Sequence, residues 1–277
     1  MTGPVNRPQP SLWPREHGAW GLLLQPFLAG AVLAGHWTWL LLPALGALLL
    51  GFALREPLVI LARQAFVWRD RTPLSPRAFR WLGCELAALA VCFSLLAAHV
   101  PPVILAAFAA VGATLTPLAV WVTIRNRQRS RLFQAASAAA LGSASLFAVA
   151  VCTGTIPGWA WTLWAVLSLH GVAAILVVHA RLARRIGLRS GAPPSSLARQ
   201  YAFQIAQIPA AAALAFVHPA LALPPLFTLA AHIMELRRLT SIDALGEPLS
   251  RVGFRTLAIA ILHLLLTMAC FWPAIHG

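Results

Sequence analysis

The chain has 277 residues, of which 60% are hydrophobic and only 10% are charged. A soluble domain carries charge on roughly a quarter of its residues, so this composition excludes water as the main solvent. The formal net charge of +14 would indicate a nucleic-acid partner for a soluble protein, but in so apolar a chain it indicates a membrane surface instead. We therefore expect the lipid bilayer as a partner and no nucleic acid.

Apolar blocks of about 16 to 23 residues alternate with short polar stretches, and a bilayer core needs about 20 apolar residues per helix. The pattern predicts an all-α integral membrane protein with about nine transmembrane helices. The predicted spans are 17–34, 37–54, 82–98, 103–123, 132–153, 158–178, 200–216, 219–234 and 253–272.

The placement of arginine predicts the orientation of these spans. The chain has no lysine, and its 21 arginines fall at the N-terminus and in every second connection. The connections around Gly35, His99, Pro157 and His218 carry none. The positive-inside rule therefore predicts a cytoplasmic N-terminus and an outside C-terminus, which agrees with an odd number of spans.

A distinctive polar and aromatic motif leads into the first predicted span. Glu16 and His17 either cap the first helix or serve a ligand or a proton transfer. This segment, with Arg55-Glu56-Pro57-Leu58 and Arg251-Val252-Gly253-Phe254-Arg255, resembles the YwiC-like family of bacterial membrane proteins. The opening motif is Pro14-Arg15-Glu16-His17-Gly18-Ala19-Trp20. The resemblance implies a multi-pass protein of the bacterial cytoplasmic (inner) membrane and no established reaction.

The first long connection, residues 55–81, contains candidate ligand-binding residues. Glu56 and Arg63 are seven residues apart and lie on one helical face with Val59 between them, and Arg55 directly precedes Glu56. This face either lines a cavity or forms an ion pair among the lipid headgroups. Residues 70–76 resemble the segment that follows the first Asp-rich motif of the UbiA prenyltransferase superfamily, which implies a UbiA-like bundle. The Asp-rich motifs that hold Mg²⁺ in that superfamily are missing, so we expect no metal and no cofactor.

The second long connection, residues 179–199, begins with His179 and continues through Arg181 and Arg184. Arginine binds phosphate well, because its planar fork contacts two oxygens at once. The alternatives are that these arginines only set the topology or only contact anionic lipid. Farther along, His232 and Glu235 lie one helical turn apart, where a carboxylate could fix the tautomer of a proton-carrying histidine or where both could be structural.

The spacing of the long connections predicts one transmembrane domain over 1–277. It permits a pseudo-repeat of 17–130 and 131–238, followed by a ninth helix at 252–272. Such a repeat would bring the two arginine-rich connections together over one cytoplasmic mouth.

These observations favour a protein that binds an amphipathic anionic ligand in a cytoplasm-facing cavity, as a diverged UbiA-like transferase would. The ligand would be an isoprenoid, a quinone or a lipid phosphate. The alternatives are a small-anion transporter or channel, and an accessory protein of a respiratory complex. The sequence indicates neither the oligomeric state nor a catalytic residue. Its ligand-binding candidates are His17, Arg55, Glu56, Arg63, His179, Arg181, Arg184, His232 and Glu235.

Overall fold

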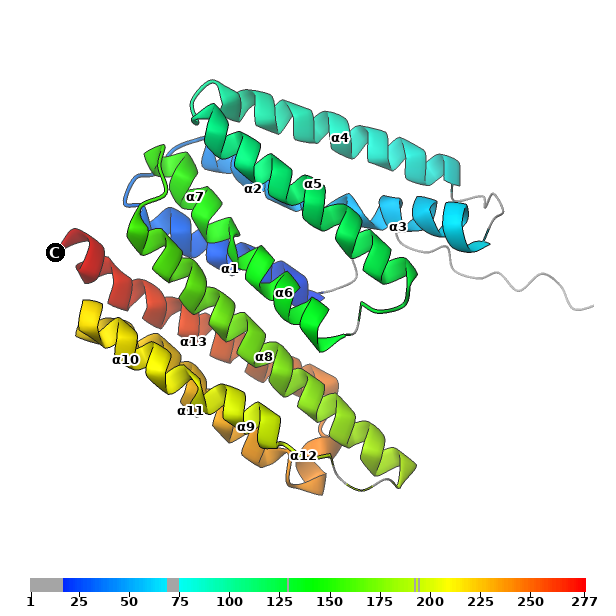
Figure 1. The fold of residues 1–277 in the computed structure, drawn as a ribbon, viewed down its shortest axis with the longest axis vertical. Helices are drawn as coiled ribbons and strands as arrows, with labels where there is room; N and C mark the ends of the chain where they lie inside the picture. The colour runs from blue at the N-terminus through cyan, green and yellow to red at the C-terminus, as the bar shows by residue number, and fades with distance from the viewer. Residues whose placement is uncertain (1–16, 69–74, 129, 192, 194) are drawn as a thin grey trace, which may run out of the picture. The chain divides into compact units, whose positions relative to one another are not determined.

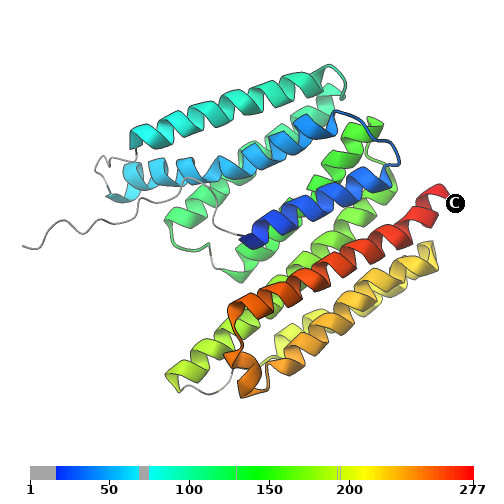
Figure 2. The same ribbon diagram turned by 180° about the vertical axis from the view of Figure 1, so that it is seen from behind.

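A computed structural model describes residues 17–68, 75–128, 130–191, 193 and 195–277. Within these ranges the regular structure is helical and there is no strand (Figures 1 and 2). Eight helical stretches are long and apolar enough to cross a membrane, and α1 (His17–Leu33) adds a shorter apolar stretch, Trp20–Leu33. The prediction of an all-α multi-pass membrane protein is confirmed, while its orientation stays a prediction.

Each predicted span falls on one of these helical stretches, and most of the helices extend beyond the predicted bounds. The eight long stretches are Leu41–Val67, Ser75–Ala97, Pro102–Ile124, Arg131–Thr153, Gly158–Ser190, Ala198–Val217, Pro219–Arg238 and Leu249–His276. The largest differences are at Leu41–Val67, which continues thirteen residues past the predicted end at residue 54, and at Gly158–Ser190, which forms the single helix α8 and continues twelve residues past the predicted end at residue 178. Polar residues continue a helix without penalty once it reaches the headgroup region, so hydropathy alone marks its end too early.

Proline breaks two spans. The first consists of α2 (Leu41–Ala53) and α3 (Arg55–Arg63), followed by a π-helical turn, Gln64–Trp68, and the second of α9 (Ala198–Ile205) and α10 (Gln207–Val217). A proline clashes with the carbonyl four residues earlier and cannot donate a hydrogen bond to it. Pro57 and Pro209 each stand four residues after the last residue of the preceding helix, so proline chemistry accounts for both breaks.

A third span breaks without proline, between α6 (Arg131–Gly142) and α7 (Ala144–Thr153). The Ser143 hydroxyl donates to the Ala140 carbonyl at 2.6 Å, and the Ser145 hydroxyl donates to the Gly142 carbonyl at 2.9 Å. Serine side chains that bond to carbonyls of the preceding turn compete with the helical ladder and bend the helix. This break therefore has a side-chain cause.

The chain forms two compact units. The first contains residues 42–128, together with the chain up to Trp20. In it α3 packs against both α4 (Ser75–Ala97) and α5 (Pro102–Ile124). Val59 of α3 is buried against Val120 and Ile124 of α5, so the main packing of this unit runs along α3.

The second unit contains Gly21–Leu41 and Arg129–Gly277. Its central element is α8, which packs against α6, α11 (Leu223–Arg238) and α13 (Leu249–His276). A 3₁₀ turn, Pro219–Ala222, precedes α11, and the short α12 (Ile242–Gly246) joins α11 to α13. The three helices α8, α11 and α13 pack pairwise against one another, so residues on their inner faces come together.

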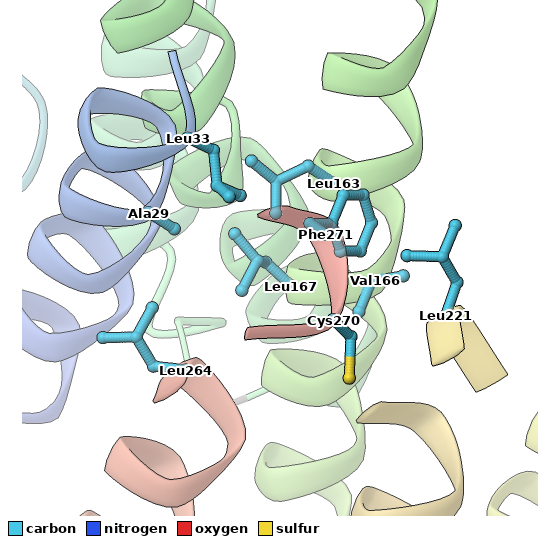
Figure 3. Packing of buried hydrophobic residues seen from close by; sticks show 9 residues of the cluster. All are labelled: Ala29, Leu33, Leu163, Val166, Leu167, Leu221, Leu264, Cys270 and Phe271. Atoms are coloured by element: carbon cyan, nitrogen blue, oxygen red, sulfur yellow. The ribbon is translucent and has the colours of Figure 1, made fainter. Parts of the chain in front are cut away.

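The core of the second unit combines large apolar side chains with very small residues. Leu33 from α1, Leu163 from α8 and Phe271 from α13 are buried in one cluster (Figure 3). A Cβ added to Gly30 would lie only 2.3 Å from the Ser145 carbonyl oxygen, so the backbones of α1 and α7 touch there. Small residues allow this close approach. The van der Waals contacts that result hold the helices together in lipid, where the hydrophobic effect does not drive helices to associate.

Candidate functional site

The predicted site residues are distributed over both units. Arg55, Glu56 and Arg63 belong to the first unit, and His179, Arg181, Arg184, His232 and Glu235 belong to the second. His17 is the first residue of α1, and its side chain lies outside the part of the chain that the structure describes. The expected meeting of the two arginine groups over one mouth stays a prediction.

In the first unit, the predicted residues lie on α3. The Arg55 side chain donates to the Thr123 hydroxyl of α5 at 3.4 Å. Glu56 and Arg63 are both half-buried. Arg55 therefore contributes at least one link between α3 and α5.

In the second unit, Arg181 is buried among carboxylates. Its side chain is 6% exposed, and its Nη2 atom lies 3.8 Å from Glu235 and 3.9 Å from Glu247. Its Nη1 atom donates to the Ala244 carbonyl of α12 at 2.8 Å. The Nη2 atom has no hydrogen-bond partner, although two carboxylates lie near it. Arg181 thus joins α8 to the connection between α11 and α13.

Two further arginines complete this ion-pair network. Arg255 of α13 donates from Nη2 to Glu235 at 3.0 Å and from Nη1 to Glu247 at 3.1 Å. Arg238 of α11 donates to Glu247 at 3.2 Å. Glu247 lies outside the membrane spans, and the hydrogen bond from Arg255 is the main reason why its pKa is below the usual range. Three arginines therefore share two glutamates, which leaves one positive charge unmatched.

Arg184, one turn farther along α8, also bonds to the start of the connection between α11 and α13. It donates to the Leu239 carbonyl at 2.9 Å and to the Ser195 carbonyl at 3.3 Å. Leu239 caps the C-terminal end of α11, where carbonyls lack helical partners and accept from basic side chains. These bonds give Arg184 a structural use.

A hollow of about 430 Å³ opens beside the network. Arg238 and Arg251 contribute positive charge to its wall, and Asp243 and Glu247 contribute negative charge. Both arginines are exposed. The complete lining is Arg238, Ser241, Asp243, Ala244, Glu247 and Arg251.

Three histidines stack in the interior of this unit. The rings of His170 (α8) and His263 (α13) are nearly parallel with centroids 4.1 Å apart, and the ring of His232 (α11) stacks on His170 at 5.4 Å. The Thr228 hydroxyl lies 3.2 Å from His170 Nδ1 and 3.0 Å from His263 Nδ1. All four side chains are buried.

Among the described residues, no three or more His, Cys, Asp or Glu side chains are arranged to hold a metal ion. For the three histidines, the stacking explains why they do not form a metal-binding arrangement, because ring faces and not ring nitrogens point toward one another. The Nδ1 atom of His232 is buried without a hydrogen-bond partner.

His179 is separate from this stack. Its Nε2 atom lies 2.7 Å from the side-chain oxygen of Gln134, on α6. The structure thus pairs His179 with an amide rather than with the arginines that follow it.

Sequence reasoning selected His232 but missed His170 and His263. Each of the missed histidines stands alone within an apolar span, without a charged residue one turn away. A signal was nevertheless available, because Thr228 precedes His232 by four residues and Thr267 follows His263 by four, and residues at this spacing share a helical face. Two polar pairs inside apolar helices predict a polar interior.

Comparison with known proteins gives a family but no activity. The model of a family described as YwiC-like protein matches residues 13–151, about half of the chain. The uncharacterized protein YwiC of Bacillus subtilis (strain 168) is 27% identical over 179 residues, which cover 63% of this chain and 69% of that protein. The ion-pair network and the stacked histidines lie beyond the residues that the family model matches.

Proposed function

This chain belongs to the YwiC-like family, and we propose that it binds an anionic ligand with an apolar portion in the hollow between α11 and α13. The observation that carries the proposal is this hollow of about 430 Å³ with Arg238 and Arg251 in its wall. Its volume is within the range of about 300–1,000 Å³ that small-molecule sites occupy.

The charges around the hollow favour an anion. Glu247 already accepts hydrogen bonds from Arg238 and Arg255, so its negative charge is compensated from two sides. Arg251 adds a further exposed guanidinium to the wall. A phosphate or carboxylate group can receive two hydrogen bonds from such a side chain, and the Ser241 hydroxyl can contribute another.

The surroundings of the hollow favour an amphipathic ligand. Ile242 and Leu249 are each 68% exposed and flank the residues of the wall. An apolar tail would cover these side chains while the head contacts the arginines. Isoprenoid phosphates and lipid phosphates have this combination, and the positive-inside rule predicts a cytoplasmic position for the hollow.

A UbiA-like transfer reaction receives less support from this site. Such a reaction needs carboxylates that are free to hold Mg²⁺. Glu235 and Glu247 are instead held by arginines. A guanidinium stays charged in a protein and would repel a metal ion at the same carboxylates.

Transport is the second candidate, and the broken helices favour it. Three of the spans are interrupted near their middle, at Leu54, Ser143 and Ala206. Many transporters use interrupted helices near the membrane midplane to expose backbone groups to a substrate. At the break before α10, the buried Gln207 donates to Gln204 at 2.6 Å, so polar groups are already present there.

The proposal is tested by measuring binding to the purified protein in detergent. The probes are a long-chain isoprenyl phosphate and inorganic phosphate, and native mass spectrometry after delipidation reports each complex. We expect the isoprenyl phosphate to bind, and the R251K variant to bind it about tenfold more weakly, because lysine keeps the charge but loses the planar fork, a loss of about 1.4 kcal/mol.

Arg237 provides the matched control. It is also exposed and precedes Arg238 in the chain, but it does not line the hollow, so R237K should bind as the unmodified protein does. Equal affinity of R251K and R237K would contradict the proposal. Binding of inorganic phosphate with the same affinity would show that the apolar portion contributes nothing.

A further inference from the structure

Buried polar side chains from three helices meet in the interior of the second unit. His263 is about 21 Å along α13 from Leu249, which is close to the middle of that 28-residue helix. His170 and Thr228 face it from α8 and α11, and none of the three side chains is more than 7% exposed. Ionisable side chains at this depth in a membrane are costly and generally mark an ion or proton pathway.

The hydrogen bonds of Thr228 fix the protonation of the two histidines relative to each other. A hydroxyl has one hydrogen, so Thr228 can donate to only one of the two Nδ1 atoms that flank it. When Thr228 donates to one Nδ1, the other Nδ1 carries a hydrogen and donates it to the hydroxyl oxygen. In this arrangement one ring has a protonated Nδ1 and the other has a bare one.

We infer that the Thr228 hydroxyl relays a proton between His170 and His263, and that the second unit moves protons inside the membrane. The step begins with one extra proton on His170, so that its ring is an imidazolium with a hydrogen on both nitrogens, while His263 is neutral with a bare Nδ1. The N–H bond at His170 Nδ1 breaks and its proton joins the Thr228 oxygen, and at the same time the hydroxyl proton of Thr228 leaves and bonds to His263 Nδ1. His170 is then neutral with its remaining hydrogen on Nε2, His263 is the imidazolium, and Thr228 again carries one hydroxyl hydrogen.

The short distances between the three histidine rings allow the stack to hold only one proton more than it holds when all three rings are neutral. The His170 and His263 rings are 4.1 Å apart, and that of His232 is 5.4 Å from His170, so two imidazolium charges would repel strongly in a medium of low dielectric. The nearest charged side chains on the packed helices are those of the ion-pair network, Glu235 on α11, Arg181 on α8 and Arg255 on α13. Glu235 is one helical turn from His232 on α11.

A cavity of about 10 Å³ lies next to the relay and is large enough for one water molecule. His170, His263 and Gln25 are its polar lining residues, and the remaining lining is apolar or small. A buried water needs two to four polar partners, and three polar side chains line this cavity. A water in this position would deliver a proton to the face of the histidines that Thr228 does not contact.

Two measurements on the full-length protein test the inference. In ¹⁵N-histidine spectra, with H170Q and H263Q used for assignment, we expect one Nδ1 to be protonated and the other bare. In phosphatidylcholine–phosphatidylglycerol vesicles that contain a pH-sensitive dye, a potassium diffusion potential should drive protons faster than in vesicles without protein. Replacing water by D₂O should slow this flux. No such isotope effect would be seen if Thr228 and the histidines had a purely structural role.

Thr228→Val removes the hydroxyl with little change in shape and should reduce the flux to that of protein-free vesicles, while Thr228→Ser should restore it. Thr256→Val is the control, because the Thr256 hydroxyl on α13 bonds to the Val252 carbonyl of its own helix. Any of three results would overturn the inference: equal flux in T228V and the unmodified protein, no flux above protein-free vesicles, or the same Nδ1 state in both rings. No ligand is added to the vesicles, so failure of the ligand proposal is recognised separately.

Discussion

Replacing Gly30 by alanine should separate α1 from α7. The new Cβ would lie 2.3 Å from the Ser145 carbonyl oxygen and 3.0 Å from its carbonyl carbon. Relieving this contact requires a displacement of roughly 0.5–1 Å, and a gap of that size removes a quarter to a half of the ~0.1–0.2 kcal/mol of each atomic contact. Ala29 and Leu33 are fully buried beside it, so a few tens of contacts weaken together. The expected loss is about 1–3 kcal/mol, as for other overpacked cores.

The assay is thermal unfolding in detergent, followed by tryptophan fluorescence. Gly21→Ala is the matched control on the same helix, because a Cβ at Gly21 meets no atom within 4 Å. Alanine is favoured over glycine within a helix by about 0.5–1 kcal/mol, so G21A should unfold at an equal or slightly higher temperature. If G30A were as stable as G21A, the close approach of α1 and α7 would be refuted.

Two further predictions concern topology and pH. A reporter that is active only outside the cytoplasm should give signal when fused after Gly277 and none when inserted at Arg189, and signal at Arg189 would reject the predicted orientation. The hydrogen bond from Arg255 lowers the pKa of Glu247 in the folded protein, so its stabilising contribution is present above the unfolded value of about 4.3 and disappears as the pH falls through the lower folded value. Melting temperatures between neutral and acid pH should therefore depend less on pH in E247Q than in the unmodified protein, and identical acid profiles would contradict this.

The helices were predictable because a local property, apolar length, determines them. The breaks at Leu54 and Ala206 were also within reach of the sequence, since Pro57 and Pro209 disrupt the carbonyl four residues earlier. Pro26 and Pro117 lie inside α1 and α5 without ending them, so a proline alone does not decide whether a span breaks. Whether a proline ends a helix therefore depends on more than the presence of the proline in the local sequence.

The partners of Arg181 could not be predicted from the sequence around it. Its carboxylate neighbours, Glu235 and Glu247, lie more than fifty residues later in the chain. The positive-inside rule counts arginines in a connection but does not identify their partners. The histidine stack was hidden for the same reason, because His170, His232 and His263 meet only after three helices have packed together.

The order of synthesis gives the ion-pair network a role in assembly. Arg181 leaves the ribosome first, Glu235 and Glu247 follow, and Arg255 comes later, on α13. Until α13 inserts, Glu235 lacks the guanidinium that contacts both of its oxygens, and its basic neighbour is Arg181 at 3.8 Å. Chains that stop before α13 therefore contain as many glutamates as arginines in this network, but Glu235 has no direct hydrogen bond from Arg255, and burying a carboxylate without such a bond is costly. The last of these helices to be made completes the hydrogen bonding of carboxylates that were inserted earlier.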